Sequence, residues 1–213
     1  EKNNKNAEVM ALLCVTYLQL WPYAYQDSSD SKVISAVVQM ASAVDPGGVQ
    51  SATCRAVDLA VRARYQEAKS LVESVLDSRA NDSQPPIMFY FLKGYLLEGF
   101  NEHGAAIGYL QSAQKLWPQW VLPFVLEAQA LSRLEKYNEA GNIYRNILRK
   151  NPDHTVSRIE LGILEYKYFN RNEQGQAYLK QALESDDAPK SVLSRGYLGL
   201  AEIALKRQDQ SLA

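Results

Sequence analysis

The sequence predicts an all-helical protein in which antiparallel helix pairs stack into a repeat array. The first observation is a 34-residue period: Gly94 is followed by Ala128 and then Gly162. The second is that large residues and helix breakers keep the same spacing, since Leu97 matches Leu131 and Pro118 matches Pro152. One such pair cannot bury its own apolar face, so neighbouring pairs must stack to form a continuous core.

Each repeat has the same internal plan. In the first central copy, an apolar helix over residues 87–99 meets a polar break at residues 101–103. A second helix follows over residues 104–116 and ends before Pro118, because proline cannot donate the next helical hydrogen bond. We expect the two helices to cross closely at Gly94 and Ala106, where a large side chain would push the backbones apart.

This pattern resembles the tetratricopeptide repeat. The resemblance is carried by a large residue early in the first helix, a small residue at the crossing, a second small residue in the second helix and a closing proline: Tyr90 and Phe124, Gly94 and Ala128, Ala106 and Ala140, Pro118 and Pro152. It implies a right-handed superhelical solenoid of about five to six helix pairs, the last one incomplete. The predicted divisions are a degenerate capping pair at 1–48, repeats at 49–82, 87–120, 121–154 and 155–188, and an incomplete repeat at 189–213.

The N-terminal part is the least regular. Apolar residues at helical spacing predict a helix over residues 7–20, ended by Trp21 and Pro22, and a second helix over residues 32–44. The next repeat is expected to break at residues 64–66, and the loop at residues 81–86 adds four residues to the period.

The C-terminal part continues the register with one change. The loop around residues 170–172 is one residue longer than its equivalents. We expect the last helix to run over residues 190–206, to pack through Tyr197, Ala201 and Ala204, and to break at residues 208–209. An array that stops at Ala213 would leave an apolar edge uncovered, so we expect the protein to continue beyond this residue.

Composition limits the function. The 213 residues carry a net charge of −1, without the clustered basic excess that nucleic-acid binding requires. Cys14 and Cys54 are far apart in sequence and are expected to be free buried thiols. Without a visible signal segment this favours the cytoplasm, although a periplasmic or membrane-anchored parent protein stays open. No direct membrane insertion is expected, because the apolar stretch at 7–20 is too short and too polar to span a bilayer.

No catalytic or metal-binding pattern is present. The sequence has no phosphate-binding loop, no G-x-S-x-G and no H-E-x-x-H motif. His103 and His154 fall in turns between helices, where solvated or capping histidines are expected. We therefore predict a protein that is not an enzyme and needs no cofactor.

The predicted function is a protein-interaction scaffold or adaptor. The family resemblance places inward-facing residues at the second, fifth, ninth and twelfth places of each repeat, so an apolar partner helix or peptide would bind in a concave groove. The predicted groove residues are Met88, Phe91, Tyr95, Leu122, Val125, Gln129, Ile159, Ile163 and Tyr166. Phe91, Tyr95 and Tyr166 are the predicted anchors.

Three alternatives stay open. In the first, another segment of the same chain covers the groove. In the second, the protein is a homo-oligomeric assembly subunit of a larger bacterial motility, secretion or envelope complex. An RNA-binding helical repeat is the third alternative, and the apolar groove and net charge of −1 weigh against it.

Overall fold

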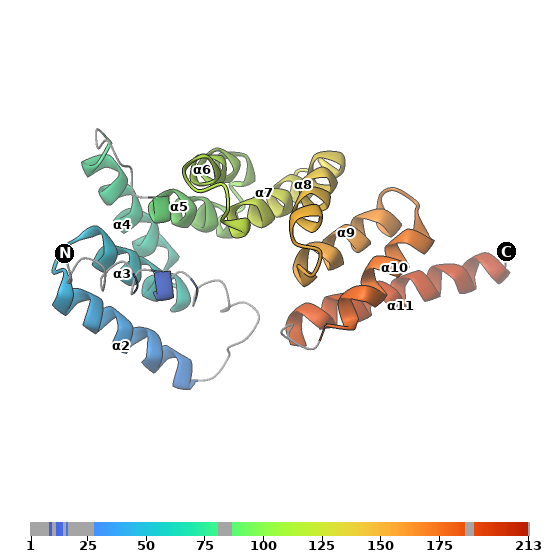
Figure 1. Ribbon diagram of the computed structural model, residues 1–213, viewed down its shortest axis with the longest axis horizontal. Coiled ribbons are helices and arrows are strands. Elements are labelled where there is room, and N and C mark those ends of the chain that lie inside the picture. The colour runs from blue at the N-terminus through green and yellow to red at the C-terminus, as the bar shows by residue number, and fades with distance from the viewer. Residues whose placement is uncertain are drawn as a thin grey trace. The chain divides into compact units, whose positions relative to one another are not determined.

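The computed structural model describes residues 9, 12–14, 16, 28–80, 87–185 and 190–212, and all regular structure in these residues is helical (Figure 1). The chain divides into two compact units, residues 1–130 and residues 131–213. Unit 1 contains α2 (Ser28–Val44), α3 (Val49–Val61), α4 (Tyr65–Ser78), α5 (Ile87–Gly99), α6 (His103–Leu116) and most of α7 (Val121–Arg133). Unit 2 contains α8 (Tyr137–Lys150), α9 (Thr155–Lys167), α10 (Asn172–Leu183) and α11 (Lys190–Leu212). The predicted all-α helical repeat fold is confirmed.

The turn between the two helices of each pair recurs at the spacing that the sequence predicts. Each turn holds one non-glycine residue in the left-handed region: Ala63 (φ 59°), Asn101 (φ 61°), Glu135 (φ 61°) and Asn170 (φ 55°). In the first three turns, the next N–H donates to the carbonyl five residues back, as from Glu102 to Leu97 at 2.9 Å. This bond pattern ends a helix with a left-handed residue and reverses the chain within a few residues. Asn101 and Glu135 are 34 positions apart, whereas Asn170 follows Glu135 after 35, which is the longer loop that the sequence predicts.

The predicted close helix crossings depend on glycine, which has no side chain. A β-carbon at Gly94 would lie 2.7 Å from Cγ of Leu110 and 3.3 Å from the carbonyl oxygen of Ala106. A β-carbon at Gly162 would lie 2.9 Å from Cγ of Leu179. Such distances are shorter than van der Waals contact, so α5 can approach α6, and α9 can approach α10, only because glycine stands at both positions.

Two predicted boundaries in unit 1 differ from the structure, and a third predicted helix is described only in part. Helix α2 begins at Ser28 and not at residue 32, because Ser and Asp are tolerated in a first turn, where backbone N–H groups lack helical partners. The break after α3 covers residues 62–64, two residues before the predicted position. Most of the predicted helix at 7–20 lies outside the described residues, but residues 9, 12–14 and 16 are helical.

The prediction for the last helix was wrong in two respects. Helix α11 runs without a break from Lys190 to Leu212, since residues 208–209 include no glycine or proline and simply continue the helix. Its buried side is formed by Val192, Gly196, Gly199 and Ile203. Tyr197, Ala201 and Ala204 are exposed, because the small glycines allow the opposite side of α11 to approach α9 and α10.

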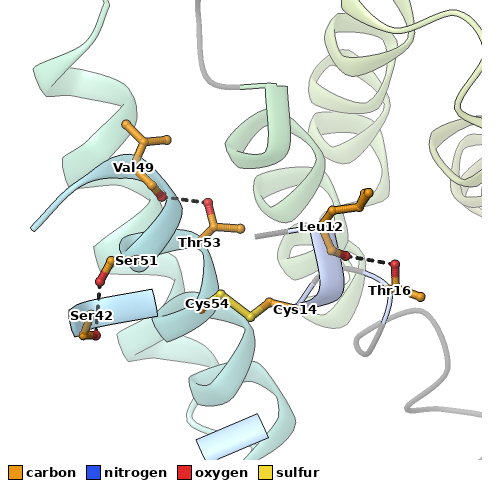
Figure 2. The surroundings of a disulfide bond; sticks show 8 residues. All are labelled: Leu12, Cys14, Thr16, Ser42, Val49, Ser51, Thr53 and Cys54. Atoms are coloured by element: carbon orange, nitrogen blue, oxygen red, sulfur yellow. Dashed lines mark hydrogen bonds between the residues drawn. A yellow bond between two sulfur atoms is a disulfide. The ribbon is translucent and has the colours of Figure 1, made fainter. Parts of the chain in front are cut away.

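The prediction of free thiols was also wrong. Cys14 and Cys54 form a disulfide, with their Cα atoms 5.2 Å apart (Figure 2). Both residues are fully buried. A separation of 40 residues gives no local motif, and the folded chain alone brings the two helical segments together.

Among the described residues, no helix combines the length and the apolar character needed to cross a membrane.

Candidate functional site

The predicted groove residues of unit 1 lie on α5 and α7 and differ in exposure. Phe91 and Val125 are 0% and 3% exposed, so their side chains belong to the core. Met88, Tyr95 and Leu122 are half-buried and pack against that core. Gln129 is also half-buried. In unit 1, four of the predicted groove residues are therefore partly accessible, and the other two belong to the core.

An aromatic cluster surrounds the buried Phe91. Its ring lies 4.5 Å from the ring of Trp120 and 6.3 Å from the ring of Tyr95, measured between centroids. Trp120 in turn lies 5.6 Å from Trp117, which is 37% exposed. Tilted rings at these separations attract each other beyond the area that they bury. Sequence reasoning missed both tryptophans, because they stand in the turn between repeats and not at groove positions.

In unit 2, the predicted groove residues are more completely covered. Ile159 and Tyr166 are 1% and 5% exposed, and Ile163 is half-buried. The Tyr166 hydroxyl donates a hydrogen bond to Glu202 of α11, and burial raises its pKa above the ordinary value. Glycine at position 199 allows α11 to approach closely, since a β-carbon there would lie only 2.9 Å from Cδ1 of Leu179. A later helix of the same chain thus covers Tyr166, one of the three predicted anchors.

A buried carboxylate, which the sequence did not reveal, connects α8 and α9. Glu165 is completely buried, and its two oxygens accept hydrogen bonds from Arg145 at 2.7 Å and from Arg171 at 3.1 Å. Both guanidinium groups also lie within 6 Å of the Phe169 ring, at 5.9 Å and 5.6 Å. Two cations and an aromatic face therefore compensate the cost of burying this charge.

A second buried charge lies in unit 1. Lys93 is 6% exposed, pairs with Glu73 of α4 and lies 5.8 Å from the centroid of the Tyr109 ring. The spacing of apolar residues cannot indicate such a pair, because it joins residues that are 20 positions apart on different helices. These contacts hold α4, α5 and α6 together.

The two histidines have structural partners. His154 caps α9: its Nδ1 accepts a hydrogen bond from the Ser157 backbone N–H at 3.2 Å, and burial lowers its pKa. His103 Nδ1 lies 2.7 Å from an oxygen of Glu98, which joins the end of α5 to the start of α6. Of the two roles expected for the histidines, solvated or capping, His154 has the capping one. In the described part of the chain, no group of three or more His, Cys, Asp or Glu residues is placed to hold a metal ion.

Comparisons with known proteins identify the fold. The chain is similar to the solved structure of PilF from Pseudomonas aeruginosa, with a TM-score of 0.70 and 16% identity over 99% of this chain and 88% of that one. It is also similar to TTC0263, a thermophilic tetratricopeptide repeat protein of Thermus thermophilus, with a TM-score of 0.68 and 13% identity over 92% of this chain and 99% of that one.

A third similar structure is YrrB, described as a tetratricopeptide repeat protein with an unusual peptide-binding site. The TM-score is 0.57 and the identity 17%, over 82% of this chain and 88% of that one. No family model matches the sequence, and no curated protein matches it either. Identities this low establish a shared architecture only, and on that basis the chain has the tetratricopeptide-repeat fold, as its sequence pattern predicts.

Proposed function

We propose that this protein is a non-catalytic interaction scaffold that binds a helix or apolar peptide along α5 and α7. The observation that carries the proposal is the half-buried apolar row formed by Met88, Tyr95 and Leu122 at the predicted groove positions of unit 1. Helical repeat arrays use the surface of their first helices to bind extended partners. The peptide-binding description of YrrB supports this class of function.

The anchors of the binding surface need revision within this proposal. Phe91 and Tyr166 are buried, so replacing either with Ala would remove core packing and lower stability by about 3–5 kcal/mol. A weakened interaction in those variants would therefore not identify a contact. Tyr95 is the predicted anchor whose side chain remains partly accessible, and Met88 and Leu122 extend the same surface.

A displayed peptide library tests the proposal. Peptides selected on the wild-type chain should be apolar or amphipathic, and their affinity for the Tyr95→Ala variant should fall at least about tenfold, as for an interface hot spot. Tyr65→Ala is the matched control, because Tyr65 is 42% exposed and stands at the start of a second helix, α4. Equal affinity for wild type and Tyr95→Ala, measured by fluorescence anisotropy, would refute the proposed groove.

A second candidate function, self-assembly, is favoured by α11. Tyr197, Leu198 and Leu205 are 60%, 61% and 62% exposed and share one side of this helix. Exposed apolar patches of this kind often serve in protein contacts. A concentration-dependent mass in analytical ultracentrifugation that Leu198→Glu abolishes would favour assembly over the scaffold alone. RNA binding, the remaining alternative, would require a salt-sensitive mobility shift with RNA.

For the compartment, we propose an oxidising environment in place of the cytoplasm favoured by the sequence. The support is the Cys14–Cys54 disulfide, since such bonds persist mainly outside the reducing cytoplasm. The periplasmic alternative left open by the sequence is consistent with it. Alkylation of the protein directly in its native cells, followed by mass spectrometry, should find no labelled cysteine; complete labelling of both would contradict the proposal.

A further inference from the structure

The disulfide joins a short N-terminal segment to the array. We define the N-terminal segment by its described residues 9, 12–14 and 16, which are helical. Figure 2 shows Cys14 on this segment reaching Cys54 on α3. Among these described residues, Cys14 is the one that is buried, while Val9, Leu12 and Leu13 are 58%, 43% and 54% exposed. The Thr16 hydroxyl donates to the Leu12 carbonyl, a bond within the segment itself.

Helix α3 is enclosed at the point where the segment is attached. The four consecutive residues Ser51, Ala52, Thr53 and Cys54 are all buried. Because successive side chains on a helix point about 100° apart, four in a row face nearly every direction. Helices α2, α4 and α5 pack against α3 and account for part of this enclosure. The disulfide places the N-terminal segment on the side that carries Cys54.

We propose that the Cys14–Cys54 disulfide is a redox-controlled clasp, which holds the N-terminal segment on α3 and releases it on reduction. A dithiol reductant would open it: one thiolate of the reductant attacks either sulfur and forms a mixed disulfide, and the other cysteine leaves as a thiolate, which takes up a proton from water. The second reductant thiol then displaces the protein, so that two protein thiols and one reductant disulfide result. This inference is independent of the proposed groove, because it concerns access to the Cys54 side of α3.

Burial of the disulfide should make its reduction depend on a local opening of the N-terminal segment. Both cysteines are 0% exposed, so a reductant can reach a sulfur only after such an opening exposes the still intact bond. The rate of reduction should therefore rise with dithiothreitol concentration and then reach a plateau set by segment opening. A rate that stays proportional to dithiothreitol concentration throughout would overturn the proposal, since it would mean that the bond is directly accessible.

Hydrogen exchange of the full chain tests whether release is local. After complete reduction, verified by alkylation of both thiols, peptides covering the N-terminal segment and residues 51–57 should exchange about tenfold faster or more. Peptides from α10, in the other unit, should be unchanged. Unchanged protection of α3 would overturn the clasp. Loss of protection throughout the chain would also overturn it, because the disulfide would then support the whole fold.

Two variants separate the clasp from a general loosening of α3. The Cys14→Ala/Cys54→Ala protein should show the exchange of the reduced chain without any reductant. Ser42→Ala removes the 3.2 Å hydrogen bond between Ser42 of α2 and Ser51 of α3 and leaves the disulfide intact. Its exchange around Cys54 should equal that of the oxidised wild type. A loss of protection in Ser42→Ala as large as that in the double variant would contradict a specific role of the disulfide.

Discussion

Gly94 determines how closely α5 and α6 can approach. Ala has the higher helix propensity, by about 1 kcal/mol, yet a β-carbon at this position would lie 2.7 Å from Cγ of Leu110, which is fully buried. We expect Gly94→Ala to lower the free energy of unfolding by about 1–3 kcal/mol, because overpacking outweighs propensity.

The control for this substitution is Gly108 of α6. A β-carbon there would meet nothing within 4 Å, so Gly108→Ala should raise the free energy of unfolding by about 0.5–1 kcal/mol. Urea denaturation of both variants measures the two effects. Stabilisation in both would show that the crossing has room to spare and would contradict the assigned register.

Glu165 provides a second prediction at the scale of single residues. Its carboxylate is completely buried, whereas the paired side chains of Arg145 and Arg171 are 37% and 55% exposed. Glu165→Gln leaves two arginines that water can solvate and should cost about 1–3 kcal/mol. Arg145→Met/Arg171→Met leaves a buried charge without its cations and should cost more, about 3–5 kcal/mol. The reverse order in thermal denaturation would contradict this account of the Glu165 pairing.

At the scale of elements, the cap of α9 makes stability depend on pH. Only a neutral His154 can accept the Ser157 N–H at Nδ1. In the folded protein, burial lowers the pKa of His154 below its ordinary value of 6.5. The unfolded chain therefore binds a proton more readily, and this contribution to stability, fully present above pH 6.5, is lost as the pH falls through the folded pKa.

Comparison with His154→Asn isolates this contribution, because asparagine caps a helix and does not titrate. Between about pH 7.5 and about pH 5, the wild type should lose more unfolding free energy than the variant does. Parallel pH profiles from urea denaturation would show that the pH dependence does not come from His154.

The elements that the sequence predicts best are those governed by short-range rules. Gly94, Ala106 and Pro118 each act within one helix pair. The period that they establish predicts the positions of α5 to α10 in the sequence closely. The uninterrupted α11 was missed, because a polar pair such as Gln208 and Asp209 breaks a helix only where tertiary contacts turn the chain. The nine groove residues remain a prediction as a binding site. Their unequal burial could not be predicted, since it depends on Trp120, which stands in the turn after α6, and on α11, which lies outside the repeats of the groove residues.

At the scale of the whole molecule, the disulfide should contribute to the stability of unit 1. It connects residues 40 positions apart, and closing a loop of this size stabilises a fold by about 2–4 kcal/mol, mainly by restricting the unfolded chain. Cys54→Ser should therefore lower the midpoint of urea denaturation under oxidising conditions. With reductant present, wild type and variant should denature at nearly the same urea concentration. A persistent difference would locate the effect in packing and not in the covalent link.

The position of the tryptophans gives the two units different optical properties. All three tryptophans of the sequence, Trp21, Trp117 and Trp120, precede residue 131, so residues 131–213 have only tyrosine and phenylalanine as aromatic chromophores. Because Trp117 and Trp120 lie 5.6 Å apart and the Trp120 ring lies against Phe91, indole emission reports on the packing of unit 1. Far-ultraviolet circular dichroism, in contrast, records the helices of both units. Coincident melting curves from the two signals would identify a single cooperative block, and separate curves would give each unit its own unfolding transition without any added label.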